Sequence, residues 1–234
     1  MTDNLLFIDT EASGLPKKWN SPTSKIKNWP FSVQVSWLVY TSNGELIKQE
    51  NHFISDDDFK ITPAAQQIHG ITREYLKEHG QPRHEVMQLL AEDMQQYQPL
   101  LIGHFMELDF HVLSADFFRS GVENPALNLN TFCTMLATKY LLLHPQNKYL
   151  RLGDLYKLLF DTPLLHQHDA LNDAAATAKS FFELFKRGEI DEDFILQQQS
   201  LKKYEHPFNR FIGWVVVLLI LLLVVILFTY RGNT

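Results

Sequence analysis

The sequence predicts an α/β domain, a mixed β-sheet flanked by helices, followed by one C-terminal transmembrane helix. Three observations lead to this prediction. The first part of the chain carries strand-like segments joined by a hairpin turn. The next part alternates short apolar strands with helical segments, and a long apolar run closes the chain. Antiparallel strands followed by strand-helix units make a mixed sheet with helices packed on it.

The predicted strands open the chain. Residues 4–9 form a short apolar run suited to a buried strand, and residues 31–40 alternate in the manner of a second strand. Asn43 and Gly44 form a strong hairpin signal. Residues 46–54 are therefore expected to return antiparallel to the second strand.

Helices dominate the rest of the domain. Pro63 and Pro82 stand at first-turn positions, where a helix tolerates proline. After another short strand at residues 100–103, Asp169 fits a helix N-cap and Gly188 fits a C-terminal stop. The helices are predicted at residues 63–69, 72–78, 82–97, 107–120, 134–143, 152–160 and 169–186.

The end of the chain is uniformly apolar. Residues 211–230 hold no ionisable side chain before Tyr230. About 20 such residues at about 1.5 Å each span the hydrocarbon core of a bilayer. A buried helix of a soluble protein normally keeps a polar stripe, which disfavours that alternative. The sequence therefore predicts a transmembrane tail anchor at residues 210–231.

Basic residues predict the orientation of this span. Lys202, Lys203 and Arg210 precede it and only Arg231 follows, which favours a cytoplasmic N-terminal side. The expected location is a membrane, crossed once, with the folded domain facing the cytoplasm. Residues 189–209 are interpreted as a polar connector, in part helical.

Composition bounds the function. A chain of 234 residues accommodates one ordinary domain, expected at residues 1–188. The net charge of -6 argues against a protein that coats nucleic acid by general electrostatic attraction. Cys133 is the only cysteine, so the chain can form neither an internal disulfide nor a cysteine zinc cage.

The first candidate site is a pair of acids. Asp9 and Glu11 end the first predicted strand two residues apart, so both side chains point to one face. Gly14 follows and allows a sharp turn or the close approach of a ligand. Taken alone, such a short acidic motif is more often a solvated strand end.

The second candidate is Asp109, just past the strand at residues 100–103. Open α/β sheets place their sites at the C-terminal ends of strands. Helix starts also attract acids through the helix dipole, so Asp109 and the nearby Glu107 have a structural interpretation too. For His104 the structural alternative is a capping or core histidine.

The third candidate combines a histidine and an acid. If Asp169 caps the helix, Asp173 lies one turn inside it and His168 stays on the preceding segment, able to swing toward a substrate. The alternative is a surface-loop histidine, like His166, with a solvated aspartate.

In combination, these sites resemble the DEDDh branch of the DnaQ-like exonucleases over about residues 4–187. The matching positions are Asp9, Glu11 and Ser13-Gly14-Leu15 in the first motif, His104 and Asp109 in the second, His168, Ala170, Asp173 and Ala174 in the third, and the IHGIT segment at residues 68–72. There are two departures from the family pattern. Phe105 stands where many relatives carry asparagine, and Ala12-Ser13 replaces a common Thr-Thr.

The resemblance implies a ribonuclease H-like fold and a 3′-5′ exonuclease that releases 5′ mononucleotides from DNA or RNA. It also implies that Asp9, Glu11, Asp109 and Asp173 hold two metal ions and that His168 takes a proton from the attacking water. Oxygen ligands suit Mg²⁺ or Mn²⁺.

The expected partners are a single-stranded 3′ end of DNA or RNA and, through the tail, a membrane. Residues 16–30 hold four lysines and no acid, interleaved with Trp19 and Trp29, which suits phosphate pairing and base stacking. Solvated lysines with core tryptophans are the alternative. The candidate substrate-binding residues are Ala12, Ser13, Gly14, Leu15, Lys17, Lys18 and His104.

Two other functions compete with this hypothesis. One is a membrane-bound scaffold that binds nucleic acid on the same fold without cutting it. The other is a different enzyme on a ribonuclease H-like sheet, such as an endonuclease. The complete set of four acids and one histidine favours the exonuclease over the scaffold.

Overall fold

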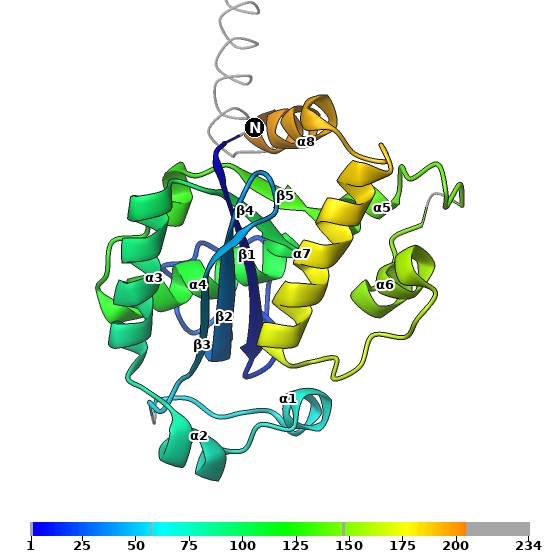
Figure 1. Ribbon diagram of the computed structural model, residues 1–234. Helices are drawn as coiled ribbons and strands as arrows, with labels where there is room; N and C mark the ends of the chain where they lie inside the picture. Colours follow the sequence, from blue (N-terminus) through cyan, green and yellow to red (C-terminus); the bar gives the residue numbers. More distant parts are fainter. Residues whose placement is uncertain (1, 57, 147, 205–234) are drawn as a thin grey trace, which may run out of the picture. The chain divides into compact units, whose positions relative to one another are not determined.

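A five-stranded mixed sheet forms the centre of the fold (Figure 1). The computed structural model describes residues 2–56, 58–146 and 148–204. The strands pair in the order β3-β2-β1-β4-β5, antiparallel among the first three and parallel from β1 to β5. The predicted mixed sheet is therefore confirmed. The strands are β1 (Asn4–Ala12), β2 (Ser32–Thr41), β3 (Leu46–Phe53), β4 (Leu100–Gly103) and β5 (Thr131–Cys133).

The sequence predicted the turn between β2 and β3 but not the strand β5. The turn between β2 and β3 contains Gly44 at a φ of 88°, a left-handed conformation that glycine adopts without strain. The sequence pattern missed β5, because three residues are too few to show a strand period. It is a strand because Leu101 and Ile102 of β4 pair with it.

Helices cover both faces of the sheet (Figure 1). On one face, Leu6 and Ile8 of β1 join the hydrophobic core that includes residues of α3 and α4. On the other, Phe7 packs edge-on against Phe181 of α7, with ring centroids 5.5 Å apart. The helices are α1 (Pro63–His69), α2 (Arg73–His79), α3 (Arg83–Tyr97), α4 (Met106–Ser120), α5 (Thr134–Thr138), α6 (Leu152–Phe160), α7 (Ala170–Lys186) and α8 (Glu192–Tyr204), with a 3₁₀ turn η1 (Pro125–Asn128).

One predicted helix is shorter than expected. The segment predicted at residues 134–143 stays helical only to Thr138. The hydroxyl of Thr138 donates to the carbonyl of Met135 over 2.6 Å and accepts the backbone N–H of Leu150 over 3.0 Å. A threonine that bonds nearby backbone in this way competes with the helix, which explains the early end.

The chain forms two compact units, Met1–Glu192 and one that begins at Asp193. The first contains the sheet and the helices α1 to α7. Of the second, the structure describes residues 193–204 of α8, which fall within the predicted connector at residues 189–209.

The predicted membrane location needs correction. None of the helices within residues 2–56, 58–146 and 148–204 is both long and apolar enough to cross a membrane. The longest, α7, has 17 residues, or about 25 Å at 1.5 Å per residue, less than the hydrocarbon core of about 30 Å. The span predicted at residues 210–231 lies outside the described residues. For the described part of the chain, the single-pass membrane prediction is wrong.

Candidate active site

The end of β1 presents two acids to the face that α7 covers. Asp9 and Glu11 share the side of the strand with Phe7, which packs on α7. Glu11 is 8% exposed. The register of β1 against β2 shifts between Glu11 and Ala12, so the strand pairing becomes irregular directly after the second acid. The predicted common face of the two carboxylates is present.

Helix α4 brings a third acid to the same strand. Asp109 lies in the first turn of α4 and is 4% exposed. Its Oδ1 accepts the backbone N–H of Thr10 over 3.0 Å and the hydroxyl of Thr10 over 2.8 Å. Because Thr10 stands between Asp9 and Glu11, these two bonds hold Asp109 beside both acids.

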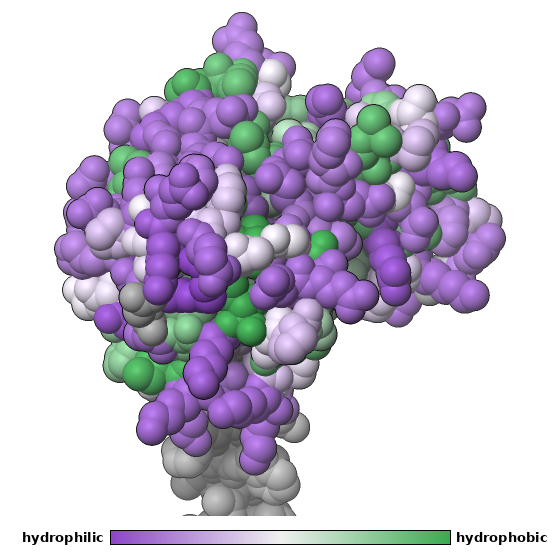
Figure 2. Space-filling model, turned by 90° about the horizontal axis from the view of Figure 1, so that it is seen from below, coloured by the Kyte–Doolittle hydropathy of each residue, from purple (hydrophilic) through white to green (hydrophobic). Residues whose placement is uncertain are grey.

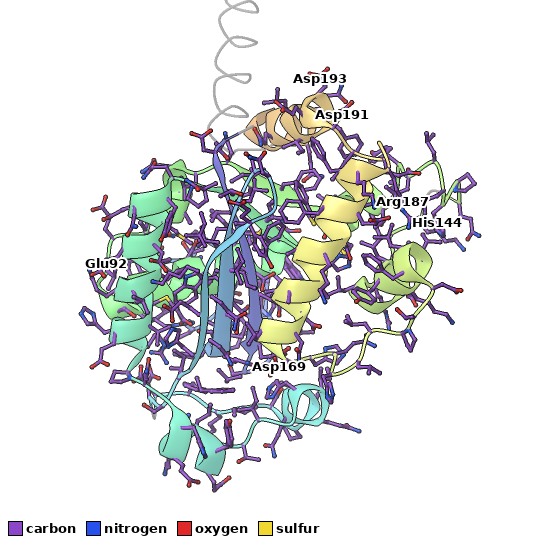
Figure 3. The ribbon with its side chains drawn as sticks, viewed as in Figure 1. Glu92, His144, Asp169, Arg187, Asp191 and Asp193 are labelled. Atoms are coloured by element: carbon purple, nitrogen blue, oxygen red, sulfur yellow. The ribbon has the colours of Figure 1, made fainter. Side chains whose placement is uncertain are left out.

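The start of α7 brings the fourth acid. Asp169 is the N-cap and accepts the backbone N–H of Asn172 over 3.0 Å. Asp173 follows in the first turn, where its Oδ2 accepts the backbone N–H of His168 over 3.0 Å. Its other oxygen, Oδ1, is buried and has no hydrogen-bond partner. Figure 3 labels Asp169 at the foot of α7, level with the end of β1.

Gln34 fastens α7 to the sheet. It pairs with Glu11 across β1 and β2 and is buried. Its amide oxygen accepts the backbone N–H of Ala170 over 3.2 Å, and its amide nitrogen donates to Asp169 Oδ2 over 3.3 Å. Sequence reasoning missed Gln34. Its signal was a polar residue inside the apolar run of a strand.

His168 lies at the edge of the acids. Its backbone is left-handed, with a φ of 66°, and its side chain is exposed. One ligand atom from each of Glu11, His168 and Asp173 lies within 4.8 Å of the other two. The segment before α7 therefore brings the imidazole beside the carboxylates.

The acids repel one another without a compensating cation. Burial raises the pKa of Asp9 well above its usual value, and the charges of Asp109, Asp173, Glu11 and Asp169 raise it further. Burial followed by the neighbouring acids raises the pKa of Glu11 to about 8.

The other two acids of the set shift in the same direction. Burial raises the pKa of Asp109 to about 7, although the hydrogen bonds from Thr10 oppose the shift. Burial also raises the pKa of Asp173, against the N–H of His168. In the described part of the chain, no lysine or arginine forms an ion pair with any of the four. Such a cluster is chemically suited to divalent cations.

The turn after β1 is held by hydrogen bonds that join Ser13 to Phe31 and Thr62. Ser13 donates its N–H to the carbonyl of Phe31 over 2.8 Å, and its hydroxyl accepts the N–H of Phe31 over 2.9 Å. The carbonyl of Ser13 accepts the N–H of Thr62, the N-cap of α1, over 2.8 Å. A Cβ on Gly14 would lie 3.1 Å from Thr62 Cγ2, a close approach that favours glycine. Leu15 then projects outward, 75% exposed.

Of the other candidate substrate-binding residues, Lys17 and Lys18 are exposed and Ala12 is half-buried. His104 is different. Its Nε2 donates to the carbonyl of Leu150 over 3.1 Å, and its Nδ1 lies 2.9 Å from the hydroxyl of Thr134. Burial lowers its pKa to about 4, so the ring is neutral. Both ring nitrogens of His104 bond inside the protein, which fits the structural alternative considered from the sequence.

Comparison with known proteins assigns the chain to a family. Residues 6–181 match the family RNase_T, described as Exonuclease. The chain belongs to this exonuclease family. The exonuclease class expected from the sequence is therefore confirmed. A comparison with curated proteins found no match.

Solved structures confirm the fold. E. coli exonuclease I with a dT13 oligonucleotide matches with a TM-score of 0.63 and 19% identity, over 79% of this chain and 41% of that one. Exonuclease I from Methylocaldum szegediense matches with a TM-score of 0.63 and 20% identity, over 79% and 40%. This chain thus spans about two fifths of the exonuclease I structures it matches. At these identities the likeness shows a shared ribonuclease H-like fold.

Proposed function

We propose that this RNase_T family member is a 3′-5′ exonuclease that hydrolyses terminal phosphodiester bonds of DNA or RNA and releases 5′ mononucleotides. The observation that carries the proposal is the convergence of Asp9, Glu11, Asp109 and Asp173 beside His168, with no lysine or arginine of the described residues paired to them. Acids in this state are costly to bury unless cations join them. The family match supports the same activity.

The four acids fit divalent cations. Asp173 Oδ1 is buried without a partner, and oxygen-only donors suit Mg²⁺ or Mn²⁺. We propose that Asp9, Glu11, Asp109 and Asp173 hold two such ions. When bound, the ions would neutralise the cluster and supply Lewis-acid stabilisation to the charge that develops at phosphorus.

Residues of the chain then carry out proton transfer, orientation of the acids and substrate binding. His168 accepts the proton of the attacking water, for which an exposed imidazole near neutral pH is suited. The N–H of His168 and the Thr10 contacts keep Asp173 and Asp109 in fixed orientations. The exposed Leu15 contacts the terminal base, while Lys17 and Lys18 pair with phosphates of the strand.

The proposed substrate is a single-stranded 3′ end. E. coli exonuclease I, which shares the fold, has been solved with dT13 and with dA16 oligonucleotides. Figure 2, which views the end of the molecule where β1 ends, presents mainly hydrophilic residues with small hydrophobic groups between them. A face of this kind suits a polar strand whose bases are exposed.

A panel of labelled oligonucleotides tests the proposal. The full chain with Mn²⁺ is incubated with single- and double-stranded DNA and RNA labelled at the 5′ end. Stepwise shortening from the 3′ end and release of 5′ mononucleotides are expected. A circular single strand separates exonuclease from endonuclease, because an exonuclease needs an end. Binding of oligonucleotide and metal without any mononucleotide release would instead identify a non-catalytic scaffold.

A further inference from the structure

The segment between β1 and β2 is fixed in place. The backbone N–H of Lys17 donates to the carbonyl of Asn28 over 3.0 Å. The Asn28 side chain accepts the N–H of Lys18 and donates to its carbonyl, each over 2.9 Å. The indole N–H of Trp29 reaches the carbonyl of Pro22 over 3.2 Å. Residues 16–30, which we call the lysine loop, therefore have a defined backbone.

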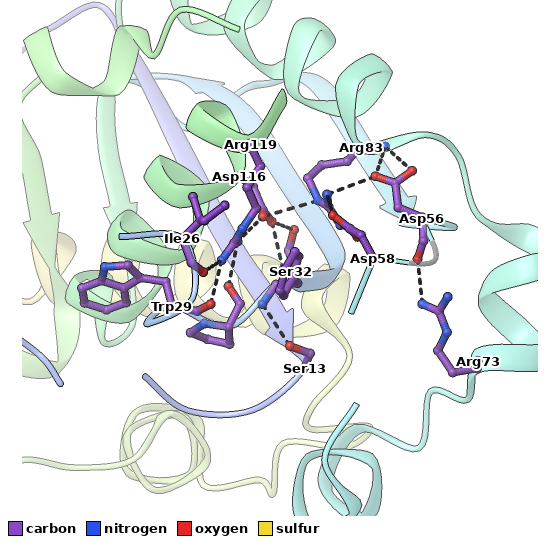
Figure 4. A network of polar contacts seen from close by, with 12 residues as sticks. Ser13, Ile26, Trp29, Ser32, Asp56, Asp58, Arg73, Arg83, Asp116 and Arg119 are labelled. Atoms are coloured by element: carbon purple, nitrogen blue, oxygen red, sulfur yellow. Dashed lines mark hydrogen bonds and ion pairs between the residues drawn. The ribbon is translucent and has the colours of Figure 1, made fainter. Parts of the chain in front are cut away.

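A buried arginine fixes the same loop from behind (Figure 4). Arg119, near the end of α4, donates to the carbonyls of Ile26, Trp29 and Pro30 over 2.7, 2.7 and 3.0 Å. It also pairs with Asp116 over 2.5 Å. Helix α4 thus positions the lysine loop as well as Asp109.

The loop carries a row of aromatic rings toward the start of α4. Trp29 is buried and stacks on His111, with centroids 4.5 Å apart and an interplanar angle of 19°. Trp19 meets Trp29 edge-on at 6.3 Å. Its other neighbour is Phe105, at 5.6 Å and 42°. Trp19 keeps 38% of its surface exposed, although it is attached to this ordered row.

Phe105 has an unusual backbone. It is the N-cap of α4 with φ 74° and ψ 42°, the left-handed region, and it provides no side-chain cap. A bulky residue is strained there, whereas asparagine adopts this conformation readily. Strain that persists in a residue beside a site points to a use for its side chain. Phe105 directly precedes α4, whose first turn carries Asp109.

The charge around the aromatic pair suits an anionic partner. Four exposed lysines, Lys17, Lys18, Lys25 and Lys27, belong to the lysine loop, and no acid does. The exposed indole of Trp19 and the half-buried ring of Phe105, with lysines nearby and a site for phosphodiester hydrolysis next to them, suit the bases and phosphates of a single strand.

We propose that Trp19 and Phe105 form a stacking platform for a nucleobase of single-stranded nucleic acid upstream of the cleaved bond, with the lysines of the loop on its phosphates. This inference rests on the proposed function and extends it, since the platform binds a nucleotide that is not itself removed. Stacking tolerates every base, so the platform serves processing of any sequence.

Two substrates separate the platform from the catalytic site. One is a single-stranded oligonucleotide. The other is the p-nitrophenyl ester of thymidine 5′-monophosphate, which has a scissile bond but no upstream base. Trp19→Ala is expected to raise KM for the oligonucleotide about 10- to 100-fold, the size of one lost base stack. Its kcat/KM for the ester is expected to stay within about twofold of the unsubstituted enzyme. Trp19→Phe should restore most of the oligonucleotide affinity.

Phe105→Asn provides a variant whose folding is not at risk. It removes the ring while placing a residue that suits the left-handed backbone. We expect an unchanged or higher Tm together with a raised KM for the oligonucleotide alone. Abasic nucleotides placed singly at the second to fifth positions from the 3′ end locate the contact. One position should raise KM for the unsubstituted enzyme and have no further effect on Trp19→Ala.

The outcomes distinguish the two proposals. An enzyme that hydrolyses neither substrate would overturn the proposed function itself. An active enzyme whose oligonucleotide KM is unchanged in Trp19→Ala and Phe105→Asn would overturn the platform alone. Equal loss on both substrates in these variants would also overturn it, because the rings would then support the catalytic site rather than an upstream base.

Discussion

Two groups of acids in this fold, one around Asp116 and one around Asp9, are built in opposite ways. Asp116 in α4 is fully buried, and it accepts bonds from the N–H and hydroxyl of Ser32. Two arginines neutralise it, Arg119 at 2.5 Å and Arg83 at 3.4 Å (Figure 4). Burial opposes ionisation of the adjoining Asp58, but its bonds to Arg83 lower its pKa overall. In this group each acid has an arginine partner.

Within residues 2–56, 58–146 and 148–204, the acids around Asp9 have no arginine or lysine ion-pair partner. Glu11, Asp109 and Asp173 are as buried as many core residues, yet burial and mutual repulsion raise their pKa values. This difference shows that burial of an acid does not by itself identify a functional site. A buried acid with arginines is a structural group, whereas several buried acids without them keep protons at higher pH or take up cations from solution.

The largest effect is expected from a substitution among the acids that have no arginine partner. Asp9→Asn should abolish exonuclease activity, because it removes a carboxylate from the proposed ion site. The same substitution should leave the metal-free protein equally or more stable, since it relieves repulsion. Activity assays and urea unfolding are the measurements, with the exposed Glu45→Gln as control. Normal activity in Asp9→Asn would contradict the site.

His168→Ala tests the same site through a side chain that is exposed, unlike the buried acids. A general base contributes about 10²- to 10⁴-fold to a rate, so kcat should fall by about that factor. Because the side chain is exposed, the Tm should stay unchanged. Rates are measured from pH 5 to 9. Survival of both kcat and the shape of the pH profile would exclude His168 as the base.

Asp116→Asn should lower stability more than activity, which is the opposite of the result expected for Asp9→Asn. Breaking a buried ion pair leaves an uncompensated charge and typically costs about 3 to 5 kcal/mol. The free energy of unfolding should fall by about this amount in urea titrations. At temperatures where the variant is folded, kcat on the p-nitrophenyl ester should change much less than in Asp9→Asn. Unaltered stability would show that the arginines are not held by this acid.

A smaller effect concerns pH and metal. An acid with a raised folded-state pKa stabilises the fold at low pH, and this contribution is lost as pH rises through the folded pKa. With Glu11 at about 8 and Asp109 at about 7, the metal-free protein should lose stability between about pH 4.5 and 8. Differential scanning fluorimetry with EDTA measures this trend.

Added Mn²⁺ should oppose that loss. Free metal at about a hundredfold above its Kd adds about 2.7 kcal/mol of stability. The gain in Tm should be greater at pH 8 than at pH 6, because protons compete with the ion at the lower pH. Glu11→Gln should reduce this difference. A Tm gain that is equal at both pH values would indicate binding away from the raised acids.

The arrangement of the candidate site was predictable from the sequence to the extent that it is local. Asp9 and Glu11 share a face because a strand alternates, and Asp173 falls one turn inside α7 because Asp169 caps the helix. The hairpin at Gly44 is equally local. In each case the spacing of nearby residues fixes the geometry.

Features that depend on distant partners were missed or left open by the sequence. Gln34 is tied to α7 only because β2 lies beside β1, and β5 is a strand only because β4 pairs with it. His104 was predicted to bind substrate, but contacts with Thr134 and Leu150 occupy both its nitrogens. Such contacts follow from the order of the strands, which no local period encodes.

The sequence alone was therefore enough to predict the strand and helices that carry the candidate acids and the histidine. These elements follow from the spacing of nearby residues. Only the tertiary structure decided which buried acids are neutralised by arginines and which are not. Arg83 and Arg119 lie far along the chain from the lysine loop and β2, and packing of α3 and α4 on one face of the sheet brings them to Asp116. Among the residues that the structure describes, Asp9 and its neighbouring acids form no ion pair with an arginine.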